Sequence, residues 1–141
     1  MSSEASSVHH GRAYIVTGGS KGIGRGAAQA IVDGGGRVVV VSRSAAHVDA
    51  AVEAFGADAA AGCVGDLSDP GLPQRAIDAS MRAFGRLDGA VISSGGPRRG
   101  TFLELTDDDW RTAFEVEFVG VTRLIRELIP VLGDGAAMAL I

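Results

Sequence analysis

The chain alternates between two patterns of hydrophobic and polar residues. Short apolar runs rich in valine, isoleucine and alanine predict strands at residues 13–16, 37–42, 57–64, 87–93 and 136–141. Between these runs, apolar residues recur at steps of three and four, which predicts amphipathic helices at residues 22–33, 45–55, 69–84 and 106–130. This alternation predicts an α/β fold, a doubly wound parallel sheet with strand order 3-2-1-4-5 and helices on both faces.

The same periodicity predicts which face of each helix is buried. On the first helix the apolar positions are Ile23, Ala27, Ala30 and Ile31. On the longest helix, for which Thr106 and Asp109 form an N-terminal capping pattern, the predicted buried seam is Trp110, Phe114, Val121, Leu124 and Leu128.

Glu117 lies on that apolar seam of the longest helix. A carboxylate buried there costs several kcal/mol unless it is paired, protonated or open to water. Two interpretations stay open. Either Glu117 belongs to a site, or the helix is rotated so that this side chain is solvated.

A glycine-rich turn follows the first predicted strand. Gly18, Gly22 and Gly24 have the spacing TGxxxGxG and stand directly before the first helix. The first glycine permits a tight turn, the second lets backbone approach a pyrophosphate, and the third lets the helix pack close to the strand. A helix N-terminus offers free N–H groups to an anion, so this stretch predicts a phosphate-binding loop.

The residues after the second strand select between the two nicotinamide dinucleotides. An acidic residue there would bind the ribose 2′-hydroxyl of NAD, but Ser42 and Arg43 occupy this place. Arg43 and Lys21, the single lysine of the chain, would together suit a 2′-phosphate. NADP is therefore the predicted cofactor, with a solvated loop charge as the alternative role for Arg43.

The loop TGGSKGIG resembles the cofactor loop of the short-chain dehydrogenase/reductase family. The resemblance implies that Asp66 and Leu67 contact the adenine, although Asp66 also suits a turn. It aligns the family's NNAG motif with residues 92–95, where both asparagines are absent and Gly95 is kept before a Gly96–Pro97 turn. The predicted cofactor-binding residues are Gly18, Ser20, Lys21, Gly22, Ile23, Gly24, Ser42, Arg43, Asp66, Leu67, Ser94 and Gly95.

The resemblance implies hydride transfer between nicotinamide and a small-molecule carbonyl or alcohol, with a serine, a tyrosine and a lysine as catalytic residues. The single tyrosine, Tyr14, lies in the first strand and the single lysine in the glycine loop, so no catalytic residue is assigned. We therefore expect the chain to be the cofactor-binding half of a reductase, inactive alone. The GGP turn and the acidic start of the longest helix resemble the 3-oxoacyl carrier-protein reductases.

Two other functions stay open at this point. A non-catalytic module that binds or senses NADP would explain the missing triad. A methyltransferase also has a glycine loop after its first strand, but it usually has an acid at the end of the second strand, which Ser42 and Arg43 oppose.

Composition limits the remaining function classes. The chain has 141 residues, which fits one domain over residues 12–141 after a disordered head at 1–11. Its net charge of −4 does not favour binding to nucleic acid. No membrane span or signal peptide is predicted, so cytoplasmic localisation is expected. The resemblance also implies subunit contacts through residues 106–130, hence a homo-oligomer.

The remaining reactive side chains receive no catalytic or metal role. Cys63 is expected to be a small buried hydrophobe, and His47 an exposed helix residue. His9 and His10 belong to the predicted head and are assigned no function. Arg98 and Arg99 would lie at the carboxyl end of the fourth strand, where they suit either an acidic ligand or plain solvation.

Overall fold

The computed structural model describes residues 8–96 and 98–141 and contains one parallel sheet. Most of the predicted head and the proline of the predicted GGP turn lie outside the described residues. The sheet order is β3-β2-β1-β4-β5, so the doubly wound sheet and its predicted strand order are confirmed. The strands are β1 (Ala13–Thr17), β2 (Arg37–Ser42), β3 (Ala60–Val64), β4 (Gly89–Ile92) and β5 (Ala137–Leu140).

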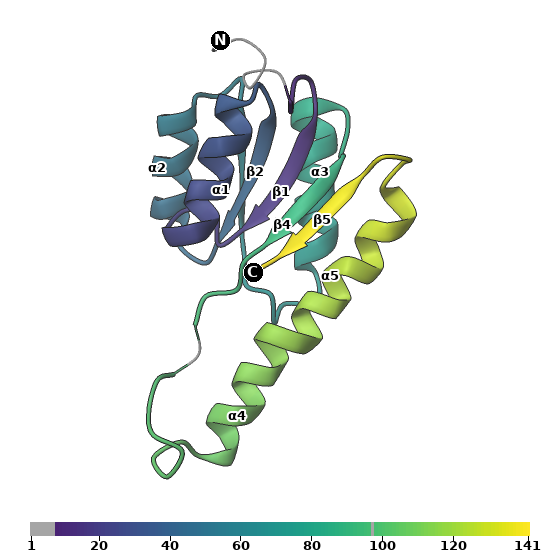
Figure 1. Ribbon diagram of the computed structural model, residues 1–141. Coiled ribbons are helices and arrows are strands. Elements are labelled where there is room, and N and C mark those ends of the chain that lie inside the picture. The colour runs from purple at the N-terminus through teal and green to yellow at the C-terminus, as the bar shows by residue number, and fades with distance from the viewer. Residues whose placement is uncertain (1–7, 97) are drawn as a thin grey trace.

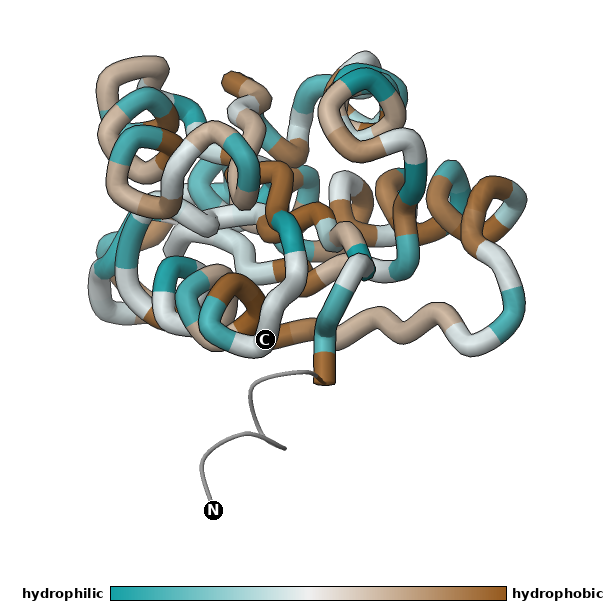
Figure 2. The backbone as a smooth tube through the Cα atoms, turned by 90° about the horizontal axis from the view of Figure 1, so that it is seen from above, coloured by the Kyte–Doolittle hydropathy of each residue, from teal (hydrophilic) through white to brown (hydrophobic). Residues whose placement is uncertain are grey.

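Helices cover both faces of this sheet. α1 and α2 lie on one side of it and α3 and α5 on the other, while α4 extends beyond the strands (Figure 1). Brown and teal alternate along the helical tubes in Figure 2, as expected for helices with one buried face. The helices are α1 (Gly22–Asp33), α2 (Ala45–Phe55), α3 (Leu72–Phe84), α4 (Asp107–Phe114) and α5 (Gly120–Leu128).

Strand β2 shows why an all-valine run suits the centre of this fold. Val38 and Val40 pack with residues of α1 and α2, whereas Val39 and Val41 pack with residues of α3 and α5. All four side chains are at most 2% exposed. Because successive side chains of a strand point to opposite faces, a strand covered on both faces has no polar position.

The buried face of α1 differs from the predicted one. Ile23 is 67% exposed and Ala30 is also exposed, so these two predicted core positions are wrong. The buried residues of the helix are Gly24, Ala28 and Ile31. The helix is rotated because Gly24, which lacks a side chain, permits the closest approach of the helix to the end of β1.

The predicted seam of the longest helix is only half right. Val121, Leu124 and Leu128 are buried, but Trp110 and Phe114 are 48% and 63% exposed. A π-helical segment, residues 115–119, separates α4 from α5. Its i→i+5 hydrogen bonds add residues to the turn and shift the side chains away from a 3.6-residue period. In addition, α4 has no sheet beside it (Figure 1).

Part of the predicted head packs against the domain. The backbone N–H of His9 donates to the carbonyl of Gly34 at 3.0 Å, and that of Gly11 donates to Gly35 at 3.3 Å. His9 Nδ1 lies 3.1 Å from the Tyr14 hydroxyl. Residues 9–11 therefore contact the turn between α1 and β2.

Asp88 joins the starts of β1 and β4, which gives a stability prediction. Its Oδ2 accepts hydrogen bonds from the Ala13 backbone N–H at 2.9 Å and from Arg86 Nε at 2.8 Å. The hydrogen bonds from Arg86, with a smaller contribution from Ala13, hold the Asp88 pKa below its usual value. A lowered folded-state pKa contributes stability above the unfolded-state pKa of about 4, and this stability is lost as pH falls through the folded-state pKa.

We expect Asp88→Asn to lower the free energy of unfolding by about 1 kcal/mol at pH 7, and the deficit to shrink as pH falls below about 4. Urea unfolding at pH 7, 4 and 3 measures this. Asp49→Asn, at an exposed position on α2, is the matched control and should stay within about 0.5 kcal/mol of wild type. A deficit that does not change with pH would contradict the assigned role of the Asp88 charge.

Candidate functional site

A crevice of about 640 Å³ opens at the carboxyl ends of the first four strands. This is the edge where open α/β sheets bind ligands. Each predicted cofactor residue except Gly24 lines the crevice, so the fold brings together four segments that are far apart in sequence. Further lining residues, not predicted from the sequence, include Thr17, Gly65, Ser93, Thr112, Ala113 and Val116.

The three glycines of the loop differ in conformation and in surroundings. Gly18 has φ +63°, and a Cβ there would lie 2.7 Å from the carbonyl oxygen of Ser93. Gly22 has φ +53°, and a Cβ there would meet nothing within 4 Å, which leaves open space for a ligand. A Cβ on Gly24 would overlap the Gly18 carbonyl, so Gly24 serves helix packing beneath the crevice.

The start of α1 is suited to an anion. Lys21 is the N-cap residue in an extended conformation, and no side chain caps the first turn. The N–H groups of this turn therefore keep their capacity to bind an anion at the crevice.

Thr17 and Ser93 join the ends of β1 and β4 beneath the crevice. The Thr17 hydroxyl donates to the Ser93 carbonyl at 3.0 Å and accepts from the Ser93 N–H at 2.9 Å. Thr17 is only 2% exposed. This pair uses backbone groups of Ser93, so it braces the site without the asparagines that the family motif has here. The sequence feature that could have predicted this pair is a hydroxyl residue, Thr17, directly before the first glycine of the loop.

Arg43 and Lys21 are exposed cations that both line the crevice. Arg43 Nε is 3.9 Å from Asp66 Oδ2, and its side chain is 75% exposed. Ser20 and Ser42, the residues that precede these cations in sequence, contact each other, with the Ser20 hydroxyl donating to Ser42 Oγ at 3.0 Å. The crevice is thus lined by two hydroxyls in contact with each other and by the cation that follows each of them in sequence.

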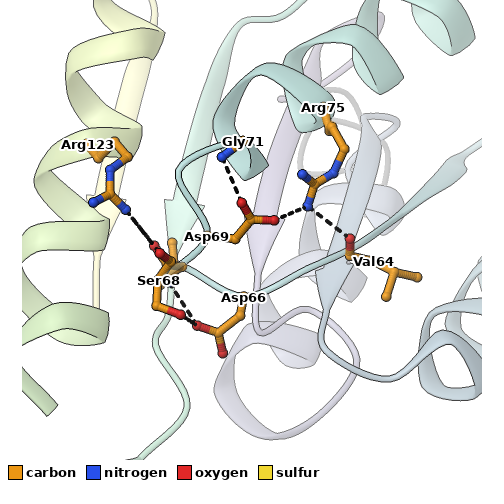
Figure 3. A network of polar contacts seen from close by, with 8 residues as sticks. Val64, Asp66, Ser68, Asp69, Gly71, Arg75 and Arg123 are labelled. Carbon is orange, nitrogen blue, oxygen red and sulfur yellow. Dashed lines mark hydrogen bonds and ion pairs between the residues drawn. The ribbon is translucent and has the colours of Figure 1, made fainter. Parts of the chain in front are cut away.

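Asp66 forms a turn and faces the crevice at the same time. Its Oδ1 accepts a hydrogen bond from the Ser68 N–H at 2.8 Å, as the turn interpretation predicts (Figure 3). Its Oδ2 is the oxygen nearest to Arg43. The turn role of Asp66 is therefore compatible with a ligand contact.

A second cluster fixes the following residues of the loop (Figure 3). Asp69 accepts from the Gly71 N–H and from Arg75, each at 2.8 Å. These bonds, that from Gly71 foremost, lower the Asp69 pKa. Arg75 also reaches the Val64 carbonyl at 3.5 Å, so the loop between β3 and α3 is held at both ends.

Glu117 lies at the crevice and is exposed. The solvation that the rotated-helix interpretation predicts is therefore compatible with the site interpretation, and the π-helical segment accounts for the position of Glu117 outside the buried seam. Arg98 Nη1 pairs with Asp109 Oδ2 at 2.9 Å, whereas Arg99 lies at the mouth as an exposed side chain.

The other reactive side chains lie away from the crevice. Cys63 is 8% exposed, and burial raises its pKa, as expected for a structural thiol. His47 is exposed, as predicted, on α2. Among the described residues, no three or more His, Cys, Asp or Glu side chains are grouped to hold a metal ion. None of the helices in the described part of the chain is long and apolar enough to cross a membrane.

Comparisons with known proteins agree with this geometry. The family model described as short chain dehydrogenase matches residues 12–140. An uncharacterized oxidoreductase of Methylorubrum extorquens is 34% identical over 131 residues, which are 91% of this chain and 53% of the relative. An uncharacterized NAD-dependent oxidoreductase of Mycobacterium tuberculosis is 31% identical over 160 aligned positions, covering all of this chain and 58% of the relative.

A solved structure shows the same fold. L-Sorbose reductase from Gluconobacter frateurii, complexed with NADPH and L-sorbose, superposes with a TM-score of 0.80 at 22% identity. The match covers 91% of this chain and 49% of that one. This chain therefore spans about half the length of the proteins it matches.

Proposed function

This chain belongs to the short-chain dehydrogenase family, and on that premise we propose that its crevice binds NADP(H) for hydride transfer between nicotinamide and a carbonyl or alcohol. The bound nicotinamide would supply or accept the hydride. The crevice fits a dinucleotide because Gly22 leaves open space beside the uncapped start of α1.

The observation that carries the choice of NADP is the cation pair at the mouth. Lys21 comes from the glycine loop and Arg43 from the end of β2, and both line the crevice. They are the sequence neighbours of Ser20 and Ser42, whose hydroxyls lie 3.0 Å apart. We propose that they bind the 2′-phosphate, since an acid that would hold the ribose hydroxyl of NAD is absent from this end of β2. The similar proteins differ in this respect, since the Mycobacterium tuberculosis oxidoreductase is described as NAD-dependent and the L-sorbose reductase structure is a complex with NADPH.

Titration of NADPH and NADH against wild type and Arg43→Ala tests this proposal. Each charge-assisted hydrogen bond contributes about 1.5–3 kcal/mol. We therefore expect NADPH to bind more tightly than NADH, and Arg43→Ala to weaken NADPH about tenfold or more with little change for NADH. Arg126→Ala, at an exposed arginine of α5, is the matched control. Equal affinities in wild type, or an unchanged Arg43→Ala, would contradict the choice of NADP.

The positions of Tyr14 and Lys21 favour a division between binding and catalysis. Tyr14 is 7% exposed in β1, and its hydroxyl contacts His9 in the turn before that strand. Lys21 lies at the mouth, where the 2′-phosphate would hold it. We propose that neither serves as the proton-donating pair of the family's chemistry, and that these 141 residues supply the cofactor-binding function. The other candidate is a non-catalytic NADP-binding or sensing module, which the same positions favour.

We expect the 141-residue polypeptide to bind NADPH but to show no turnover of ketones or short 3-oxoacyl thioesters, because neither the single tyrosine nor the single lysine is placed to protonate the developing alkoxide. Steady-state and stopped-flow assays that follow the absorbance of the reduced nicotinamide measure this. Glu117→Gln is the informative variant, since Glu117 is an acid at the crevice. Turnover by wild type that Glu117→Gln abolishes would refute the proposed division. The reading frame after codon 141 distinguishes the half-enzyme from the module.

A further inference from the structure

The long helix contacts the loop between β3 and α3 at two neighbouring points. A Cβ on Gly120 would overlap the Leu67 carbonyl, so helix and loop backbones touch there. One turn further, Arg123 Nη1 donates to the carbonyls of Leu67 and Ser68, at 3.4 Å each (Figure 3). Leu67 itself is 8% exposed and lines the crevice.

The Arg123 guanidinium is held from its other side as well. Its side chain is only 16% exposed, and Nη2 pairs with Glu115 Oε1 at 3.1 Å. Glu115 begins the π-helical segment and Arg123 follows it, so the ion pair spans that irregular turn. A largely buried cation needs several partners to offset its lost hydration, and here one carboxylate and two loop carbonyls provide them.

The loop that Arg123 holds leads directly to the crevice mouth. The Ser68 N–H donates to Asp66 Oδ1, and Asp66 Oδ2 lies 3.9 Å from Arg43 Nε. A displacement of the Ser68 backbone would therefore move the Asp66 carboxylate relative to Arg43. Leu67 would move with it, since it stands between these two residues.

We propose that Arg123 is a positioning residue of the nucleotide site. Through the carbonyls of Leu67 and Ser68 it fixes the wall of the crevice beside Arg43, and Glu115 orients its guanidinium. This inference rests on the proposed function, because it assigns the Asp66–Leu67 wall to the adenosine end of the dinucleotide. It adds a residue outside the crevice whose change weakens ligand binding without altering any lining side chain.

The test measures binding of 2′,5′-ADP, the adenosine half of NADP, to Arg123→Met and Arg123→Lys. We expect about a tenfold loss of affinity in Arg123→Met and a return to within about threefold of wild type in Arg123→Lys, which keeps a cation and its donors. Hydrogen exchange should quicken in residues 66–71 of Arg123→Met and stay unchanged in β1 and β2. Arg126→Met, at an exposed arginine on the same helix, is the control.

Unchanged affinity for 2′,5′-ADP in Arg123→Met would overturn the inference. A loss of affinity that Arg123→Lys does not restore, together with faster hydrogen exchange throughout the sheet, would overturn it as well. If Arg123→Met does not fold, the affinity of Glu115→Gln for 2′,5′-ADP tests the inference instead. This substitution removes the ion pair, and we expect about a threefold loss of affinity, so wild-type affinity overturns the inference. Wild type that binds no 2′,5′-ADP at all would reject the proposed function itself, whereas a binding wild type with unaltered variants rejects only the role of Arg123.

Discussion

Gly24→Ala is expected to weaken NADPH binding at least tenfold and to lower the free energy of unfolding by about 1–3 kcal/mol. The added Cβ would overlap the Gly18 carbonyl and lie 3.1 Å from the Thr17 carbonyl. Both are backbone atoms that no side-chain rotation can move away. The helix must therefore shift off the end of β1, which displaces the glycine loop at the crevice.

Gly26→Ala is the matched control for this substitution. Gly26 belongs to the same helix, and a Cβ there would meet nothing within 4 Å. Alanine is favoured over glycine in a helix by about 1 kcal/mol, so Gly26→Ala should leave stability unchanged or raise it by about that amount. Alanine has the same helix propensity advantage at position 24, but there the overlap of its Cβ with the Gly18 carbonyl costs more than this advantage gains. Thermal unfolding and NADPH titration of the pair measure the difference, and equal behaviour would contradict the close helix-to-strand contact.

Leu124→Ala is expected to lower the free energy of unfolding by about 2–5 kcal/mol. Leu124 is fully buried in the hydrophobic cluster between the sheet, α3 and α5. The substitution removes Cγ and the two methyl groups of the side chain where neighbours from several elements prevent collapse. Urea unfolding, followed by circular dichroism, gives the change.

Phe114→Ala is the informative comparison for Leu124→Ala. The hydrophobic period alone assigns both residues to one buried seam, but Phe114 is 63% exposed and its ring lies 5.2 Å from that of Phe118. We expect a loss of at most about 1 kcal/mol at low protein concentration, because only part of an aromatic pair is removed. A loss equal to that of Leu124→Ala would show that α4 is buried and that the seam is continuous.

The glycine loop shows how closely local sequence can specify a site. Gly18 and Gly22 adopt positive φ, and the spacing of the glycines with the flanking strand and helix predicts a phosphate loop before any coordinates are seen. The parallel sheet then carries Ser42, Asp66 and Ser94 to the same edge, because Ser42 ends β2 while Asp66 and Ser94 lie two residues after the ends of β3 and β4. Residues at strand ends are thus placed by topology that the sequence pattern already determines.

Sequence periodicity determined the order of strands and helices, the βαβ pairing and the residue types at the crevice. It did not determine the rotation of each helix, because an apolar stripe is broad and a backbone contact can override it, as Gly24 does for α1. Nor did it reveal the π-helical segment, which moves Phe114 and Glu117 out of the seam. The Thr17–Ser93 bridge and the Arg123 contact with the loop at Leu67 join residues more than fifty positions apart. Only tertiary structure decides such contacts, because they depend on the relative placement of elements whose local patterns carry no information about one another.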